Sequence, residues 1–273
     1  MTATVVPVRH DDGQFYIPSD YCIPMSTVIT WFRTVEGFVI GSDGRNSDAE
    51  THQVITDDAQ KIFPVERPHV RLAYALAHTI RLGRAADQVM FDFPTEVPRA
   101  FEVLSARRRT DWQLYLRALA KTLSERLNAS RNSSGLTLDK PTETYIFLGG
   151  YFEKRVKVGH IHFRHGAVSS EAEPYVHPPE FNAPPFGSEA VFDLISKGDS
   201  RFSQYSEPKR KNVFTLSEAI SRAEKDIRAH CDLEALKLDP DRCRGIGGRV
   251  QIATVTFTHG FRWVRGFEPV SGG

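Results

Sequence analysis

The sequence predicts an α+β fold in which two antiparallel sheets pack face to face, with helices on their outer surfaces. Two observations support this class. Helices are expected in blocks between groups of strands, and that order argues against alternating βαβ units and a parallel sheet. Paired runs of β-branched and aromatic residues, joined by tight turns, stand near both ends of the chain, as antiparallel hairpins do. A hydrophobic content of 40% is enough for such a chain to bury a core.

The first half of the chain is expected to hold two strand pairs followed by helices. The first pair is separated by the turn R-T-V-E-G. The clearest helix places Trp112, Leu116 and Leu119 on one face, with Lys121 on the opposite face. The predicted elements are strands at 28–32, 37–42, 60–65 and 70–75, a helix at 77–90 interrupted at Gly83, a loop at 91–98 and a helix at 111–127.

The second half is expected to return to strands after two helices. A capping box, T-L-S-E beginning at Thr215, predicts the start of the longer helix. The predicted elements are strands at 144–151 and 156–163, a loop at 171–186, a short helix after Gly187-Ser188, the helix from Thr215, and strands at 250–257 and 261–264. We assign residues 1–25 to a propeptide or flexible tail, 26–267 to one domain and 268–273 to a second tail.

Composition excludes several classes of protein. The net charge is +1, with 35 basic and 34 acidic residues, so we expect no binding to nucleic acid or to an anionic membrane. No apolar run approaches the roughly 18 residues of a membrane span. The start of the chain lacks the basic-then-apolar layout of a signal peptide. The 3 cysteines are far apart and odd in number, which indicates a reducing, cytoplasmic setting.

Three residues with complementary chemistry stand at the ends of predicted strands. Thr27 opens the first strand, Asp43 follows the second and Lys61 lies in the third. If these strands are neighbours, a hydroxyl, a carboxylate and an ammonium group meet at one end of a sheet. A hydroxyl is a poor nucleophile and needs a base, and a free α-amine with a pKa of about 7.7–8.0 can serve. The trio therefore suits N-terminal nucleophile catalysis, which requires removal of the residues before the nucleophile.

The same stretch resembles a known family. The block T-V-I-T-W-F-R-T-V-E-G-F-V-I-G-S-D-G-R, followed by D-D-A-Q-K-I-F, is similar to the opening of proteasome-type β subunits, including bacterial proteasome-like peptidases. The resemblance implies that Thr27 is both nucleophile and amine base, that Asp43 is the supporting carboxylate, and that Lys61 lowers the pKa of the amine. It also implies a four-layer αββα sandwich of the Ntn hydrolase type, cleavage of peptide or small amide bonds without a cofactor, and a homo-oligomer that is ring-like in relatives.

Further site residues follow from the resemblance. It implies that Ser188 orients the amine and a water, whereas the sequence alone assigns Ser188 to the N-cap of a helix. Ala77 or His78 stands where related subunits place a glycine whose backbone N–H stabilises the oxyanion, and any residue except proline keeps that donor. Near the C-terminal strand the family often has an acidic residue before Ser-Gly-Gly. Here the nearest candidates are Asp241 and Cys243, and the position of Cys243 between Arg242 and Arg244 is expected to lower the pKa of its thiol.

Three alternatives remain open at this point. Translation could begin at Met25, and removal of that methionine would expose Ser26 as the nucleophile in place of Thr27. The chain could also be a catalytically silent proteasome-like subunit that acts in assembly or binding. That reading is motivated by the substituted glycine, by the missing acidic residue and by the lack of a glycine before Thr27. Hydrolysis of a small amide on the same fold is a third possibility.

A short run of histidines raises the question of a metal site. His160 and His162 are expected on one face of a strand, an arrangement that suits two metal ligands, and His165 follows. No further Cys, Asp or Glu stands at an obvious partner spacing. We therefore predict surface or packed histidines and no metal.

Overall fold

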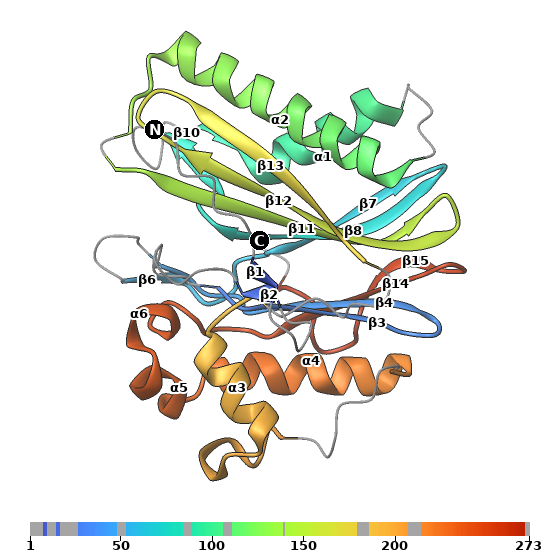
Figure 1. Ribbon diagram of the computed structural model, residues 1–273, viewed down its shortest axis with the longest axis vertical. Coiled ribbons are helices and arrows are strands. Elements are labelled where there is room, and N and C mark those ends of the chain that lie inside the picture. Colours follow the sequence, from blue (N-terminus) through green and yellow to red (C-terminus); the bar gives the residue numbers. More distant parts are fainter. Residues whose placement is uncertain are drawn as a thin grey trace.

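The computed structural model describes residues 27–47, 53–83, 89–105, 111–138, 140–178, 186–206 and 214–270 (Figure 1). It also describes the backbone of β1 (Val8–Arg9) and β2 (Phe15–Tyr16). Within these ranges the chain is an α+β protein with antiparallel sheets and six α-helices, which confirms the predicted class. Among the described residues, no helix is both long enough and apolar enough to cross a membrane.

The larger sheet has five antiparallel strands in the order β13-β12-β11-β8-β7. Helices α1 (Phe93–Ser105) and α2 (Trp112–Ser134) lie against its outer face, and their apolar sides form one core with it. The strands are β7 (Ile62–Arg67), β8 (Val70–His78), β11 (Thr142–Phe152), β12 (Arg155–His165) and β13 (Ser170–His177).

The smaller sheet has four antiparallel strands in the order β15-β14-β4-β3. Helix α4 (Leu216–His230) begins at the predicted capping box and packs against the outer face of this sheet (Figure 1). The strands are β3 (Ile29–Arg33), β4 (Gly37–Ser42), β14 (Gln251–Thr256) and β15 (Gly260–Trp263). The remaining helices are α3 (Glu189–Lys197), α5 (Leu233–Leu238) and α6 (Pro240–Cys243), with a short 3-10 turn at Ser200–Phe202.

The two sheets pack against each other through a separate apolar core. Along β8, Ala73, Ala75 and Ala77 face this core, and their small side chains let the sheets approach closely. Gly149 of β11 makes room for Phe38 of β4. A Cβ at position 149 would lie 2.0 Å from Phe38 Cζ, so no other residue fits there.

Two short strand pairs complete the described structure. β5 (Asn46–Ser47) pairs with β6 (Val54–Thr56) in the segment between Asp43 and Lys61. β9 (Arg81–Gly83) pairs with β10 (Val89–Asp92). The predicted helix at 77–90 is therefore wrong, because its first residues continue β8 and the rest of its described residues include these two strands.

The predicted loop at 91–98 is also wrong, since residues 93–98 begin helix α1. Pro94 lies in the first turn of the helix, where a backbone N–H has no helical partner to lose. Pro98 lacks the N–H that would bond to the carbonyl of Pro94. The hydroxyl of Tyr74 donates to that carbonyl instead, at 3.3 Å. A side chain from the sheet thus supplies the hydrogen-bond donor that Pro98 lacks.

The predicted loop at 171–186 contains most of strand β13. Pro174 is tolerated there because β13 is an edge strand, and only one of its sides pairs with a neighbour. Pairing with β12 brings Pro174 opposite Ile161. Helices α5 and α6 were not predicted, and both begin at an aspartate whose side chain accepts a hydrogen bond from the first turn.

Candidate active site

The side chains of Thr27, Asp43 and Lys61 meet where the two sheets adjoin. Lys61 Nζ lies 3.2 Å from Thr27 Oγ and 3.0 Å from Asp43 Oδ2. Ile29 of β3 pairs with Ser42 of β4 in antiparallel orientation. Thr27 stands shortly before Ile29 and Asp43 just after Ser42, so this pairing brings the two residues together. Lys61 enters from the other sheet, one residue before β7. All three side chains are buried.

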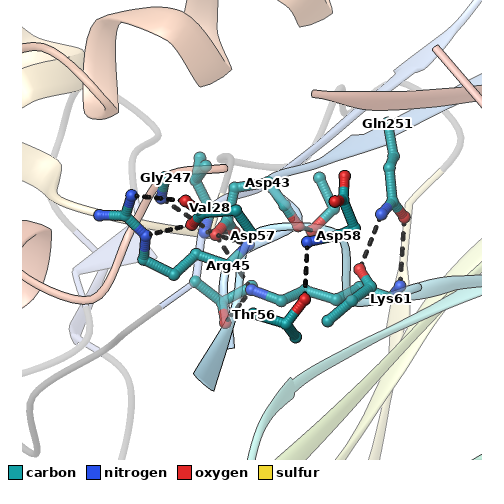
Figure 2. Close-up of polar contacts among 12 residues, drawn as sticks. Val28, Asp43, Arg45, Thr56, Asp57, Asp58, Lys61, Gly247 and Gln251 are labelled. Atoms are coloured by element: carbon teal, nitrogen blue, oxygen red, sulfur yellow. Dashed lines mark hydrogen bonds and ion pairs between the residues drawn. The ribbon is translucent and has the colours of Figure 1, made fainter. Parts of the chain in front are cut away.

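The carboxylate of Asp43 accepts from four donors, partly visible in Figure 2. Backbone N–H groups of Val28, Arg45 and Gly247 donate at 3.0, 3.2 and 3.3 Å, and the Lys61 ammonium supplies the fourth bond. Burial raises the pKa of Asp43, while the charge of Lys61 and the backbone donors act against that rise. Since every partner is a donor, the ionised carboxylate fits this environment and a protonated one would not.

Gln251, the first residue of β14, holds the backbone at Lys61 in place through two hydrogen bonds (Figure 2). Its Oε1 accepts from the Lys61 N–H at 3.2 Å, and its Nε2 donates to the Ala59 carbonyl at 2.7 Å. On the other side, the Leu76 N–H donates to the Lys61 carbonyl at 3.0 Å. Gln251 was not predicted as a site residue, because 190 positions separate it from Lys61 and no local motif marks it.

The turn after Asp43 is held by the loop that leads to Lys61. Arg45 Nε lies 2.7 Å from Asp57 Oδ1, and the Arg45 N–H donates to the Gly247 carbonyl at 2.9 Å. A Cβ at Gly44 would lie 2.8 Å from the Arg249 carbonyl oxygen and 2.9 Å from that of Asp57. Gly44 is therefore required by close packing of three backbone segments, and it does not have the positive φ that an Asp-Gly turn would suggest.

Ser188 is buried beside the start of β3. Ile29 and Phe186 exchange two backbone hydrogen bonds of 2.8 Å, and this antiparallel pairing leads Ser188 toward Thr27. Ser188 is the N-cap of α3, as predicted, and its hydroxyl donates to Asp239 Oδ2 at 2.6 Å. Asp239 is thus the acidic partner near this site, and the sequence analysis named its neighbours instead.

Asp241 and Cys243, the two residues expected near this position, do not supply the acidic contact. Asp241 lies within the short helix α6, which begins after Asp239. Cys243 is buried, and burial raises the pKa of its thiol to about 12. The adjacent arginines were expected to lower that pKa, but desolvation outweighs them.

Ala77 and His78 end strand β8 beside Tyr145 of β11. Ala77 is buried between the sheets. His78 has a positive φ of 64°, unusual for a residue with a side chain. Its ring lies 5.7 Å from the rings of both Tyr145 and Phe186, measured between centroids. Burial lowers the pKa of His78 from 6.5 to about 4, so the imidazole is neutral at neutral pH.

Other predicted positions lie elsewhere or are not described. Ser26 falls outside the described residues. His160 Nδ1 lies 2.9 Å from His177 Nε2, in a pair of imidazoles on β12 and β13. His162 Nε2 lies 3.2 Å from Glu143 Oε1. In the part of the chain that the structure describes, no three His, Cys, Asp or Glu side chains are grouped so as to hold a metal ion.

Of the comparisons with known proteins, the one with solved structures found a match and the other two found none. No family model matches the chain, and no curated protein matches it. Among solved structures, the chain is similar to one described as Anbu (ancestral beta-subunit) from Yersinia bercovieri. The two share 14% sequence identity over 89% of this chain and 88% of that chain, with a TM-score of 0.44.

Proposed function

We propose that this protein is a proteasome-like amide hydrolase of the N-terminal nucleophile type, with the four-layer αββα arrangement of that class. The observation that supports it most is the position of Lys61 Nζ, which contacts both Thr27 Oγ and Asp43 Oδ2. A buried hydroxyl that touches a carboxylate-held ammonium is poised to lose its proton more readily than a hydroxyl in water. Its substrates are peptides or small amides.

The proposed reaction has two covalent steps. The Thr27 oxygen attacks the carbonyl carbon of the amide, and its proton passes to the free α-amine of the same residue. The amine then gives that proton to the leaving nitrogen as the C–N bond breaks, which leaves an ester on Thr27. Water attacks the ester with the same amine as base, and the acid product leaves. Lys61 stabilises the negative charge that develops on the Thr27 oxygen.

This scheme requires cleavage of the bond between Ser26 and Thr27. Until then, the nitrogen of Thr27 is an amide nitrogen and cannot act as a base. The hydrogen bond from the Lys61 ammonium to the Thr27 hydroxyl supports Thr27 as the nucleophile. The Val28 N–H also bonds to Asp43, so the residue after the new terminus is anchored before and after cleavage.

The backbone N–H of His78 is the better candidate for the oxyanion donor. Successive N–H groups along a strand point to opposite sides. The Leu76 N–H points toward β7 and bonds to the Lys61 carbonyl, so the His78 N–H points to the same side, just beyond Lys61. The N–H of Ala77 faces β11, its neighbour on the other side. We assign the pair of Ser188 and Asp239 to orientation of the amine.

Intact mass and turnover of the purified protein test this function together. We expect the loss of residues 1–26 and cleavage of a fluorogenic peptide such as succinyl-Leu-Leu-Val-Tyr-aminomethylcoumarin. Thr27→Ala should abolish turnover, and Thr27→Ser should retain part of it because the hydroxyl remains. A mass that lacks only residues 1–25 would make Ser26 the nucleophile. Full turnover in processed Thr27→Ala would overturn the proposal.

A catalytically silent subunit is the second candidate. It is favoured by the observation that Thr27 is buried. A full-length mass, with no turnover of peptides or of small amides, would support it. For either candidate we propose a cytoplasmic homo-oligomer, which light scattering of the purified protein would test.

A further inference from the structure

His78 breaks the alternation of strand β8. Residues on one face of β8 join the core between the sheets, and those on the other face join the core beneath α1 and α2. Position 78 belongs to the second set, so a regular strand would direct its side chain toward the helices. The positive φ of His78 turns the imidazole to Tyr145 and Phe186 instead, and both of these pack on the core between the sheets. The residues that face the core between the sheets are Ala73, Ala75 and Ala77. Those that face the core beneath α1 and α2 are Leu72, Tyr74 and Leu76.

A left-handed conformation is unfavourable for a residue with a Cβ, so the surroundings must hold it. The next residue, Thr79, is held at three points. Its N–H donates to the Glu143 carbonyl at 3.0 Å, and its hydroxyl lies 2.6 Å from that of Thr142. Its carbonyl accepts a hydrogen bond from the Thr144 hydroxyl. We call residues 78 and 79 the His78 corner.

The bond from Thr144 is the last in a chain of buried hydrogen bonds that we call the relay. It runs from Arg131 of α2 through Ser170, His165 and Thr144 to the Thr79 carbonyl. Arg131 NH1 lies 2.8 Å from Ser170 Oγ, and Ser170 Oγ lies 2.9 Å from His165 Nδ1. His165 Nε2 lies 2.9 Å from Thr144 Oγ.

The two ends of the relay determine the direction of every bond within it. A guanidinium only donates, so the Ser170 hydroxyl accepts from Arg131, and its own proton is then available for Nδ1 of a neutral His165. His165 then carries its proton on Nε2 and donates to Thr144, which leaves the Thr144 proton for the Thr79 carbonyl. This order requires a neutral imidazole. Burial, assisted by the charge of Arg131, lowers the pKa of His165 from 6.5 to about 4, which keeps it neutral.

We propose that Thr144 and His165 are positioning residues for the reaction, because the relay holds the His78 corner and so places the backbone N–H of His78 beside Lys61. This inference rests on the proposed function. It goes further by assigning a role to a network on the far side of the larger sheet from Thr27, anchored on helix α2. A shift of the corner would misplace the oxyanion donor without touching the nucleophile, so it would lower kcat more than it changes KM.

The test compares Thr144→Val, which removes the hydroxyl at nearly constant volume, with Thr144→Ser, which restores it. The matched control is Thr30→Val, because the Thr30 hydroxyl is buried and has no hydrogen-bond partner within the described residues. Thr144→Val should accelerate amide exchange at Thr79 by about tenfold or more, since a buried carbonyl loses its partner. It should also lower kcat by about tenfold or more with little change in KM. Thr144→Ser and Thr30→Val should resemble the wild type.

The outcomes separate this inference from the proposed function. Exchange at Thr79 needs no substrate, so unchanged exchange in Thr144→Val overturns the relay whether or not the protein is an enzyme. Faster exchange with an unchanged kcat overturns the positioning role alone. Absence of turnover in the processed wild type overturns the proposed function. If Thr144→Val does not fold, nitrogen NMR of wild-type His165 decides, because a proton on Nδ1 at pH 7 would contradict the relay.

Discussion

Gln251 accepts a hydrogen bond from the backbone N–H of Lys61 at 3.2 Å, although 190 positions separate the two residues. The same side chain donates to the Ala59 carbonyl, so one amide bonds to two backbone groups on the N-terminal side of the Lys61 side chain. Gln251 is fully buried and opens strand β14 of the smaller sheet, whereas Lys61 leads into β7 of the larger one. The contact therefore ties the two sheets together at the candidate site.

Gln251→Leu should weaken this contact between the two sheets, because leucine has a similar side-chain volume but no amide group. We expect the free energy of unfolding to fall by about 1–3 kcal/mol, because a buried N–H and a buried carbonyl lose their partner. Urea unfolding measures this change, and turnover of the processed protein should fall with it. Thr254→Val, on the same strand, is the matched control, since the Thr254 hydroxyl makes only a long bond of 3.4 Å. Equal stability of the two variants would contradict the role of Gln251.

Lys61→Met should be strongly destabilising, because it leaves the buried carboxylate of Asp43 without its counter-charge. We expect a loss of about 3–5 kcal/mol in the free energy of unfolding. The double variant Lys61→Met with Asp43→Asn should recover much of that loss, because no buried charge remains. A double-mutant cycle in urea measures the coupling between the two side chains. Additive effects would show that the ion pair contributes nothing of its own.

His78→Gly should retain turnover, whereas His78→Pro should lose it. Glycine keeps the backbone N–H and adopts a φ of 64° without strain, so catalysis should persist if only the backbone contributes. Proline removes the N–H and holds φ at about −65°, so turnover should be lost. Peptide hydrolysis by the two processed variants, checked for folding by circular dichroism, measures the difference. Full activity in His78→Pro would exclude this N–H as the oxyanion donor.

Acidification should destabilise the protein between about pH 6.5 and pH 4. Burial lowers the pKa of His78, His165 and His230 from 6.5 to about 4, so in this window the unfolded chain binds protons that the folded chain does not. Their contribution is fully present above pH 6.5 and is lost as the pH falls toward 4. Burial raises the pKa of Asp43, so this residue by itself would make the folded state more stable on acidification. The effect of the three histidines is larger. Melting temperatures that stay constant or rise on acidification would contradict this expectation.

Much of the fold could be predicted because its signals are local. The hairpin of β3 and β4, the strands β7, β8, β11 and β12, and the helix α2 follow from residue type, periodicity and turns. The cap at Ser188 and the capping box at Thr215 were also predicted, since each involves residues only a few positions apart. The convergence of Thr27, Asp43 and Lys61 was expected from strand order and is found in the structure.

The errors occur where tertiary contacts outweigh local preference. Residues 91–98 were expected to form a loop, but helix α1 begins there, and the hydroxyl of Tyr74 supplies the hydrogen bond that Pro98 cannot. Pro174 argued against strand β13, but an edge strand has one side without ladder bonds. Cys243 was expected to have a low thiol pKa beside two arginines, and burial raises that pKa instead. In each case the outcome depends on how the elements pack, which local residue preferences do not describe.

The sequence by itself determined the α+β class, the leading hairpins and the types of residue that form the candidate site, because these depend on neighbours within a few positions. Only the tertiary structure decided that Gln251 holds Lys61, that Asp239 partners Ser188, and that a chain of bonds from Arg131 reaches the His78 corner. The physical reason is that each of these contacts joins strands or helices distant in sequence. A buried polar group must find a partner once the core closes, and nothing in the local pattern names that partner.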